Sequence, residues 1–65
     1  MTYTVSGPGL DRPAPCLGSA IIRAQRAAEL AREPAAYYIR ADGRAVAVVE
    51  RTPSGTVFTT AREER

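Results

Sequence analysis

Residues 36–50 read AYYIRADGRAVAVVE, two runs rich in apolar side chains on either side of the pair Asp42-Gly43. An Asp-Gly pair in this setting is a strong signal for a β-hairpin with a two-residue turn of type I′, because both residues tolerate positive φ angles. Several flanking residues are β-branched or aromatic, which suits a pleated strand. The stretch therefore predicts two antiparallel strands joined by a tight turn.

A two-residue loop also fixes which residues face one another. It predicts that Ile39 lies opposite Val46 and Tyr37 opposite Val48 on one face, while the other face pairs Arg40 with Ala45 and Tyr38 with Ala47. Further along, Pro53-Ser54-Gly55 is typical of a three-residue loop with a left-handed glycine, leading into a third strand over 56–60. In that register Phe58 joins the face of Tyr37 and Ile39.

The segment before the hairpin predicts one helix. Residues 20–33 read AIIRAQRAAELARE, with Ser19 as a candidate N-cap and Pro34 as the terminator. At 100° per residue, one face of this helix gathers Ala20, Ile21, Ala24, Ala27, Ala28 and Ala31. Such small side chains allow a helix to lie close against a sheet.

The two ends of the chain complete the predicted architecture. Residues 2–5 alternate polar and apolar types and predict a short strand with Tyr3 and Val5 inward. Residues 6–18 contain three glycines and three prolines and predict a connecting loop, and residues 61–65 form a charged tail. We therefore expect one α+β domain over residues 1–65, a two-layer β-α-β-β-β arrangement with one helix on a small, mostly antiparallel sheet that ends in a three-stranded meander.

The size and the cysteine content restrict how such a domain is stabilised. A domain of 65 residues buries only about 60% of the surface that its unfolded chain exposes. Small domains usually gain stability from disulfides, a metal or oligomerisation. Cys16 is the only cysteine and histidine is absent, so we expect no disulfide, no metal site and no cofactor. Oligomerisation remains as the expected source of stability.

No catalytic pattern is complete in this sequence. Gly7-Pro8-Gly9 lacks the third glycine of a dinucleotide-binding loop, where Arg12 stands, and the chain has no lysine for a Walker loop. Cys16 has no histidine to act as its base, so a small apolar role is the simpler interpretation. We therefore expect a protein that is not an enzyme.

Charge and hydropathy restrict the surroundings and the partners. The longest apolar run, Ala45–Val49, is far shorter than the ~20 residues that span a bilayer, and the N-terminus lacks the pattern of a signal peptide. With one unpaired cysteine, we expect a cytoplasmic protein without a membrane partner. A net charge of +2 is too small to indicate nucleic-acid binding by itself. The composition, rich in arginine and alanine, is similar to that of small proteins from high-GC actinobacteria and their phages.

One helix covers only one face of the predicted sheet, yet Ala45–Val49 is apolar on both faces. A contiguous apolar patch on a small protein usually marks an interface. We expect a protein-interaction module that forms a homodimer or a higher homo-oligomer and binds another protein through Tyr38, Ala45, Ala47, Val49, Val57, Ile22 and Leu30. The alternative is a nucleic-acid-binding sheet that uses Tyr38, Arg40 and Arg51. The third interpretation is that the valines and alanines reflect strand propensity alone.

Overall fold

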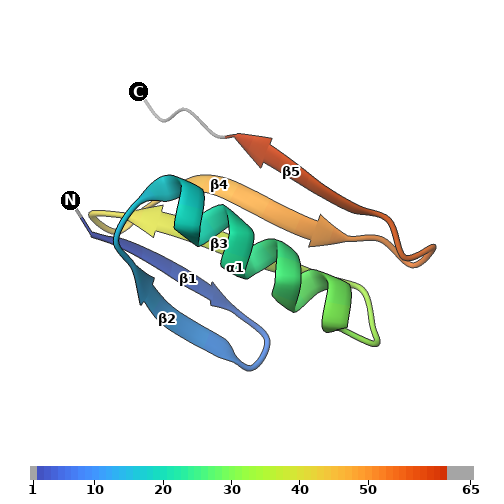
Figure 1. Cartoon of the computed structure of the whole chain (residues 1–65). Helices are drawn as coiled ribbons and strands as arrows, with labels where there is room; N and C mark the ends of the chain where they lie inside the picture. The colour runs from blue at the N-terminus through green and yellow to red at the C-terminus, as the bar shows by residue number, and fades with distance from the viewer. Residues whose placement is uncertain (1, 62–65) are drawn as a thin grey trace.

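The computed structural model describes residues 2–61 as an α+β fold of two layers, one helix on one antiparallel sheet (Figure 1). The helix is α1 (Leu17–Leu30), and the strands are β1 (Tyr3–Gly7), β2 (Leu10–Ala14), β3 (Ala35–Ala41), β4 (Arg44–Arg51) and β5 (Val57–Ala61). The strand order is β2-β1-β3-β4-β5, and every neighbouring pair is antiparallel. This confirms the predicted fold class and the C-terminal meander, and it adds one strand to the predicted sheet.

The hairpin of β3 and β4 has the predicted turn. Asp42 and Gly43 have φ angles of 52° and 78°, as a type I′ turn requires. Ala41 pairs with Arg44 directly across the turn, and the predicted pair of Arg40 with Ala45 is confirmed.

Beyond that pair, the predicted register is wrong by one residue. Ile39 pairs with Ala47 and Tyr37 with Val49, because a β-bulge leaves Val46 without a partner in β3. An extra residue in one strand exchanges the two faces for every residue that follows it. Val48 and Phe58 therefore face away from the helix, whereas Ala47, Val49 and Val57 lie on the helix side.

The predicted loop over residues 6–18 is also wrong, because most of it forms a hairpin. Gly7 pairs with Leu10 around a Pro8-Gly9 turn, in which Gly9 has a φ angle of 71°. Proline at the first turn position and a left-handed glycine at the second form the pattern of a type II turn. β2 lies at the edge of the sheet, where Pro13 costs no ladder hydrogen bond.

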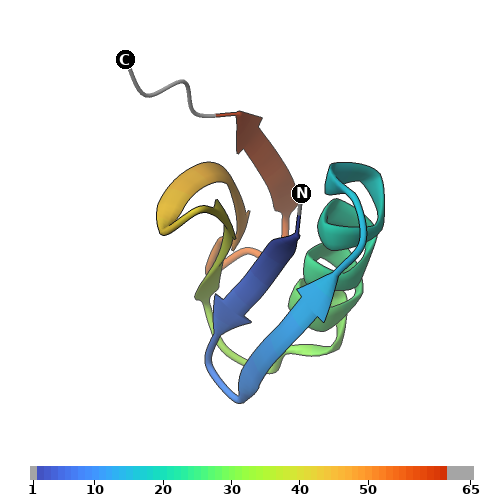
Figure 2. The same cartoon turned by 90° about the vertical axis from the view of Figure 1, so that its left-hand side faces the viewer.

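The helix begins and ends three residues earlier than predicted. Its N-cap is Cys16, which makes no side-chain cap hydrogen bond, so the predicted Ser19 cap is wrong. The alanine face is confirmed for Ala20, Ala24 and Ala28, which are completely buried against the sheet, whereas Ala31 lies past the last turn as the C-cap. Figure 2 shows the helix lying along one side of the twisted sheet. The core therefore lies between this smooth helix face and the helix side of the central strands.

The loop between β4 and β5 matches its prediction, with a strand that starts one residue later than expected. The Thr52 N–H donates to the Thr56 carbonyl at 2.9 Å, and Gly55 has a φ angle of 90° between them. Phe58 consequently pairs with Glu50. Of the predicted tail, Ala61 belongs to β5, and residues 62–65 lie outside the described residues.

Candidate functional site

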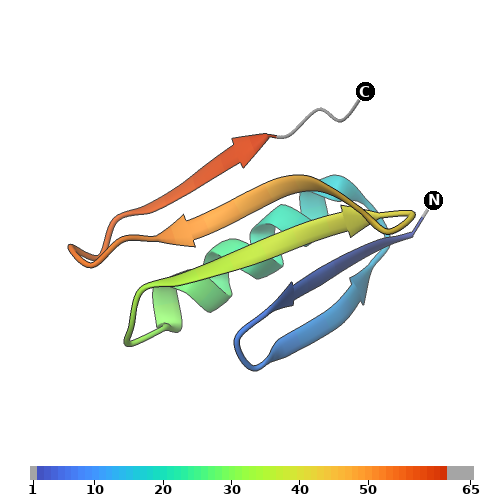
Figure 3. The same ribbon diagram turned by 180° about the vertical axis from the view of Figure 1, so that it is seen from behind.

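The sheet surface turned away from α1, called the open face below, is not covered by any helix or strand of residues 2–61 (Figure 3). Its central row runs across all five strands through cross-strand partners: Asp11, Ser6, Tyr38, Val48 and Thr60. A second row holds Pro13, Thr4, Arg40 and Ala45, and a third, on the other side of the central row, holds Ala36, Glu50 and Phe58.

Two aromatic residues dominate the exposed apolar surface of the open face. Tyr38 is 36% exposed and Phe58 is 40% exposed. Val48, the cross-strand partner of Tyr38 in the central row, is only 5% exposed, since the side chains around it already shelter it. The face is therefore an aromatic surface with a filled centre.

The charges on the open face are mixed. The Arg40 guanidinium carbon lies 5.8 Å from the centroid of the Tyr38 ring, within range of a cation–π interaction. Glu50 is the cross-strand partner of Phe58, and Asp11 lies at the β2 end of the central row. With one base and two acids among its rows, the open face is not a basic surface.

The structure separates the residues predicted to form an interface. Tyr38 and Ala45 are on the open face, but Ala47 and Val49 are buried beneath the helix, so their predicted place on that face is wrong. Val57 packs against the core, so its predicted place on the open face is also wrong. The cause is the same bulge at Val46.

The remaining predicted interface residues lie on the helix, and two apolar residues of the open face were not predicted. Ile22 is 55% exposed and Leu30 is 83% exposed on the helix, away from the sheet, so both are accessible as predicted interface residues. Val48 and Phe58 are the open-face residues that sequence reasoning missed. The alternating apolar pattern around Val48 and Phe58 is compatible with either face of the sheet. No local sequence signal indicated the bulge, which determines the face on which each of them lies.

The residues proposed for nucleic-acid binding do not come together. Tyr38 and Arg40 are neighbours on the open face, whereas Arg51 lies on the helix side of the sheet. There the Arg51 side chain donates to the carbonyl oxygens of Ala28 and Glu29, at 3.1 and 3.3 Å. Arg51 therefore has a structural role at the end of α1, and its predicted place beside Tyr38 is wrong.

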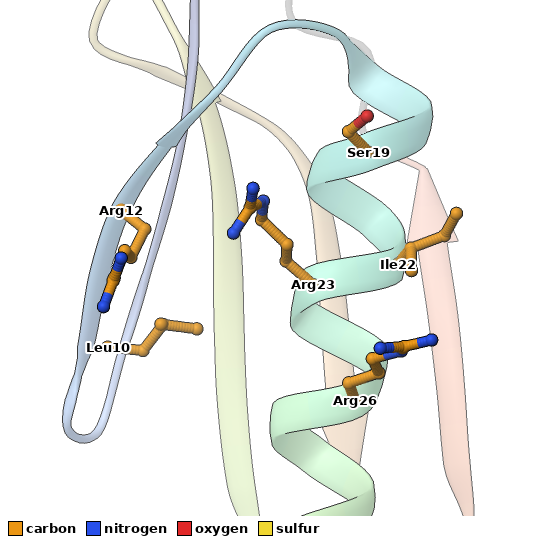
Figure 4. Close-up of a pocket in the computed structure, with 6 residues that line it drawn as sticks. All are labelled: Leu10, Arg12, Ser19, Ile22, Arg23 and Arg26. Atoms are coloured by element: carbon orange, nitrogen blue, oxygen red, sulfur yellow. The ribbon is translucent and has the colours of Figure 1, made fainter.

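The basic side chains gather in a different place, a groove between α1 and the edge strand β2. The lining of this arginine groove, about 510 Å³ in volume, consists of Leu10, Arg12, Ser19, Ile22, Arg23 and Arg26. Figure 4 shows Arg23 extending from the helix toward β2, while Ile22 and Arg26 point away from β2. No acidic residue lines the groove.

Cys16 lies in an exposed position directly before the helix. The Ser19 hydroxyl, 3.3 Å from the Cys16 Sγ, lowers the pKa of the thiol, and the nearby backbone N–H groups of Ser19 and Gly18 act in the same direction. The thiolate therefore forms at a lower pH here than on an ordinary cysteine.

Within residues 2–61, no three His, Cys, Asp or Glu side chains form a group that could hold a metal ion. The same residues include no helix with the length and apolar character needed to cross a membrane. No protein-family model matches the chain, and neither curated proteins nor solved structures give a match.

Proposed function

We propose that this protein is a cytoplasmic, non-enzymatic interaction module that forms a homodimer through its open face. The observation that carries the proposal is the exposure of Tyr38 and Phe58 on a sheet face that the only helix of residues 2–61 does not cover. Aromatic side chains bury much apolar area and are enriched in interfaces. Charged groups flank the central row on both sides, as at the rim of a protein interface.

The arrangement of charges favours a second copy of the same chain as the partner. A two-fold axis along the central row would place Tyr38 and Val48 against the same residues of the second copy, because such an interface is isologous. The same rotation exchanges the rows on either side of the axis. Arg40 would then lie over the row that holds Glu50 of the second copy, one strand spacing of about 4.8 Å away. The two rows that flank the axis are thus complementary in charge to each other, whereas the axis sets Asp11 against Asp11 of the second copy at the β2 end of the central row.

The size of the domain also favours this association. A standard interface buries about 800 Å² on each partner, and the whole chain exposes 4513 Å². Covering the open face would remove the two exposed aromatic side chains from water at one step. For a chain of 65 residues, this burial adds apolar area to the little that the alanine face of one helix supplies.

Sedimentation velocity of two variants tests the proposal. Tyr38→Ser and Phe58→Ser remove exposed side chains, so each variant should fold and yet sediment as a monomer where the unmodified chain sediments at twice the chain mass. Leu30→Ser and Ile22→Ser are matched controls, since they remove exposed apolar side chains from the helix instead. An unmodified chain that stays monomeric up to millimolar concentration would refute the proposal, and loss of the dimer in the helix variants alone would move the interface to α1.

A nucleic-acid platform on the open face is the second candidate. The stacking of Arg40 on Tyr38, with Phe58 exposed on the same face, is the observation that favours it. The acids Asp11 and Glu50 on that face oppose it, since they repel phosphate. An oligonucleotide affinity that falls steeply with added salt and disappears in Tyr38→Ser would support this candidate over the dimer.

A further inference from the structure

The arginine groove concentrates positive charge without a compensating acid in its lining. Arg12 comes from β2, whereas Arg23 and Arg26 come from α1, so two separate elements supply the charges. Arg23 points toward β2 and Arg26 points away from it, so Arg12 and Arg23 supply the charges on the two sides of the groove. A groove lined in this way is more stable when an anionic group occupies it.

The shape of the groove favours a ligand of several groups over a single small ion. Its volume of about 510 Å³ falls in the range of about 300–1,000 Å³ that is usual for ligand clefts. Leu10 and Ile22 add apolar surface to the lining. The lining thus suits a chain that carries both negative charges and aliphatic side chains.

The residues that line the groove favour an acidic peptide over single-stranded nucleic acid as the ligand. Nucleic-acid grooves combine basic side chains with aromatic rings on which bases stack, and no aromatic residue lines this groove. The planar guanidinium of arginine binds carboxylates through two parallel hydrogen bonds. Charge and apolar contacts without a stacking surface therefore favour a peptide.

The free edge of β2 offers few backbone hydrogen bonds to a bound peptide. Gly7 and Leu10 flank a two-residue loop, so they form a hydrogen-bonded pair, and the backbone groups of Asp11 and Pro13 point to the free edge. Pro13 has no N–H to donate, which leaves Asp11 as the only donor among these two. Recognition must therefore rest mainly on the arginine side chains.

We propose that the arginine groove binds a short acidic peptide segment of a partner protein, with carboxylates on Arg12 and Arg23 and an aliphatic side chain against Leu10. This site lies on the helix side of the sheet, so it stays accessible when the open face is covered. It does not depend on the proposed dimer.

Fluorescence anisotropy with a labelled Glu-Leu-Glu-Glu-Leu-Glu peptide tests the proposal on the full chain. We expect saturable binding that weakens between about 20 and about 300 mM NaCl, because the carboxylate contacts are exposed to screening. Arg12→Gln and Arg23→Gln should each weaken binding about tenfold, the loss that corresponds to one charge-assisted hydrogen bond. A peptide with Gln in place of every Glu should not bind.

Three controls make the outcome decisive. Arg32→Gln removes an exposed arginine outside the groove and should leave the affinity unchanged. Tyr38→Ser should also retain binding, which separates this site from the open face. The proposal is overturned if the peptide does not bind, if Arg12→Gln and Arg23→Gln bind it as well as the unmodified chain, or if an oligothymidylate of about 12 nucleotides binds the groove more tightly. Circular dichroism establishes that each variant is folded.

Discussion

The Arg51 side chain donates hydrogen bonds from its Nη1 to the carbonyl oxygens of Ala28 and Glu29. These carbonyls belong to the last turn of α1, where four C=O groups have no partner within the helix. The last turn of the helix has no basic residue of its own. A cation from β4 therefore satisfies the negative end of the helix dipole and ties the helix to the sheet.

Removing this cation should destabilise the fold. Arg51→Met keeps much of the apolar length of the side chain but removes the Arg51 donor from both carbonyls, while the Ala28 oxygen retains the Ala31 N–H. We therefore expect the free energy of unfolding to fall by about 1–2 kcal/mol. Urea denaturation followed by circular dichroism measures the change. Arg44→Met, at an exposed position beside the turn, is the matched control and should change stability by less than about 0.5 kcal/mol. Equal effects of the two substitutions would contradict the structural role of Arg51.

The proposed dimer predicts a specific response to charge reversal. Arg40→Glu places an acid one strand away from Glu50 of the second copy, and Glu50→Arg places an arginine one strand away from Arg40 of the second copy, so each substitution should weaken the dimer at least fivefold. The double variant restores opposite charges and should recover most of the affinity. Sedimentation equilibrium at low salt measures all four dissociation constants as a double-mutant cycle. Purely additive losses in the double variant would contradict the two-fold arrangement.

Two glycines with different surroundings should respond in opposite ways to alanine. A Cβ at Gly7 would overlap the ring of Tyr37, which is 4% exposed and cannot move aside freely. Overpacking of this kind costs about 1–3 kcal/mol. Gly18 lies in the first turn of α1 with no atom within 4 Å of an added Cβ, so Gly18→Ala should stabilise by about 0.5–1 kcal/mol. Thermal unfolding of the two variants checks both signs.

The environment of Cys16 predicts a pH dependence of its reactivity. Because the Ser19 hydroxyl lowers the pKa of the thiol, the thiolate fraction of the folded chain rises at a lower pH than in the unfolded chain. Below the ordinary pKa, iodoacetamide should therefore alkylate the folded chain faster than the chain in urea. Ser19→Ala should move the midpoint of the rate profile upward, toward the unfolded value. Identical profiles for Ser19→Ala and the unmodified chain would show that this contact has no effect.

Local sequence patterns were sufficient for several parts of the fold. The type I′ turn at Asp42-Gly43, the loop with left-handed Gly55 and the buried alanine face of the helix all follow from conformational preferences within a few residues. The glycine- and proline-rich segment was wrongly predicted to be a loop, because Pro8-Gly9 forms the turn of a hairpin. The proline of the second strand of this hairpin is tolerated only at a sheet edge.

The sequence by itself determined the α+β class, the turn at Asp42-Gly43 and the side of the helix that is buried, because each depends on neighbours in the chain. Only the tertiary structure decided which apolar residues of β4 and β5 face the helix. The bulge at Val46 places Ala47 and Val49 beneath α1 and turns Val48 and Phe58 outward. Alternating apolar residues fit either face equally well, so the choice depends on packing against a helix distant in sequence. The same long-range packing brings Arg51 to the end of α1 and leaves Tyr38 and Phe58 exposed together on the open face.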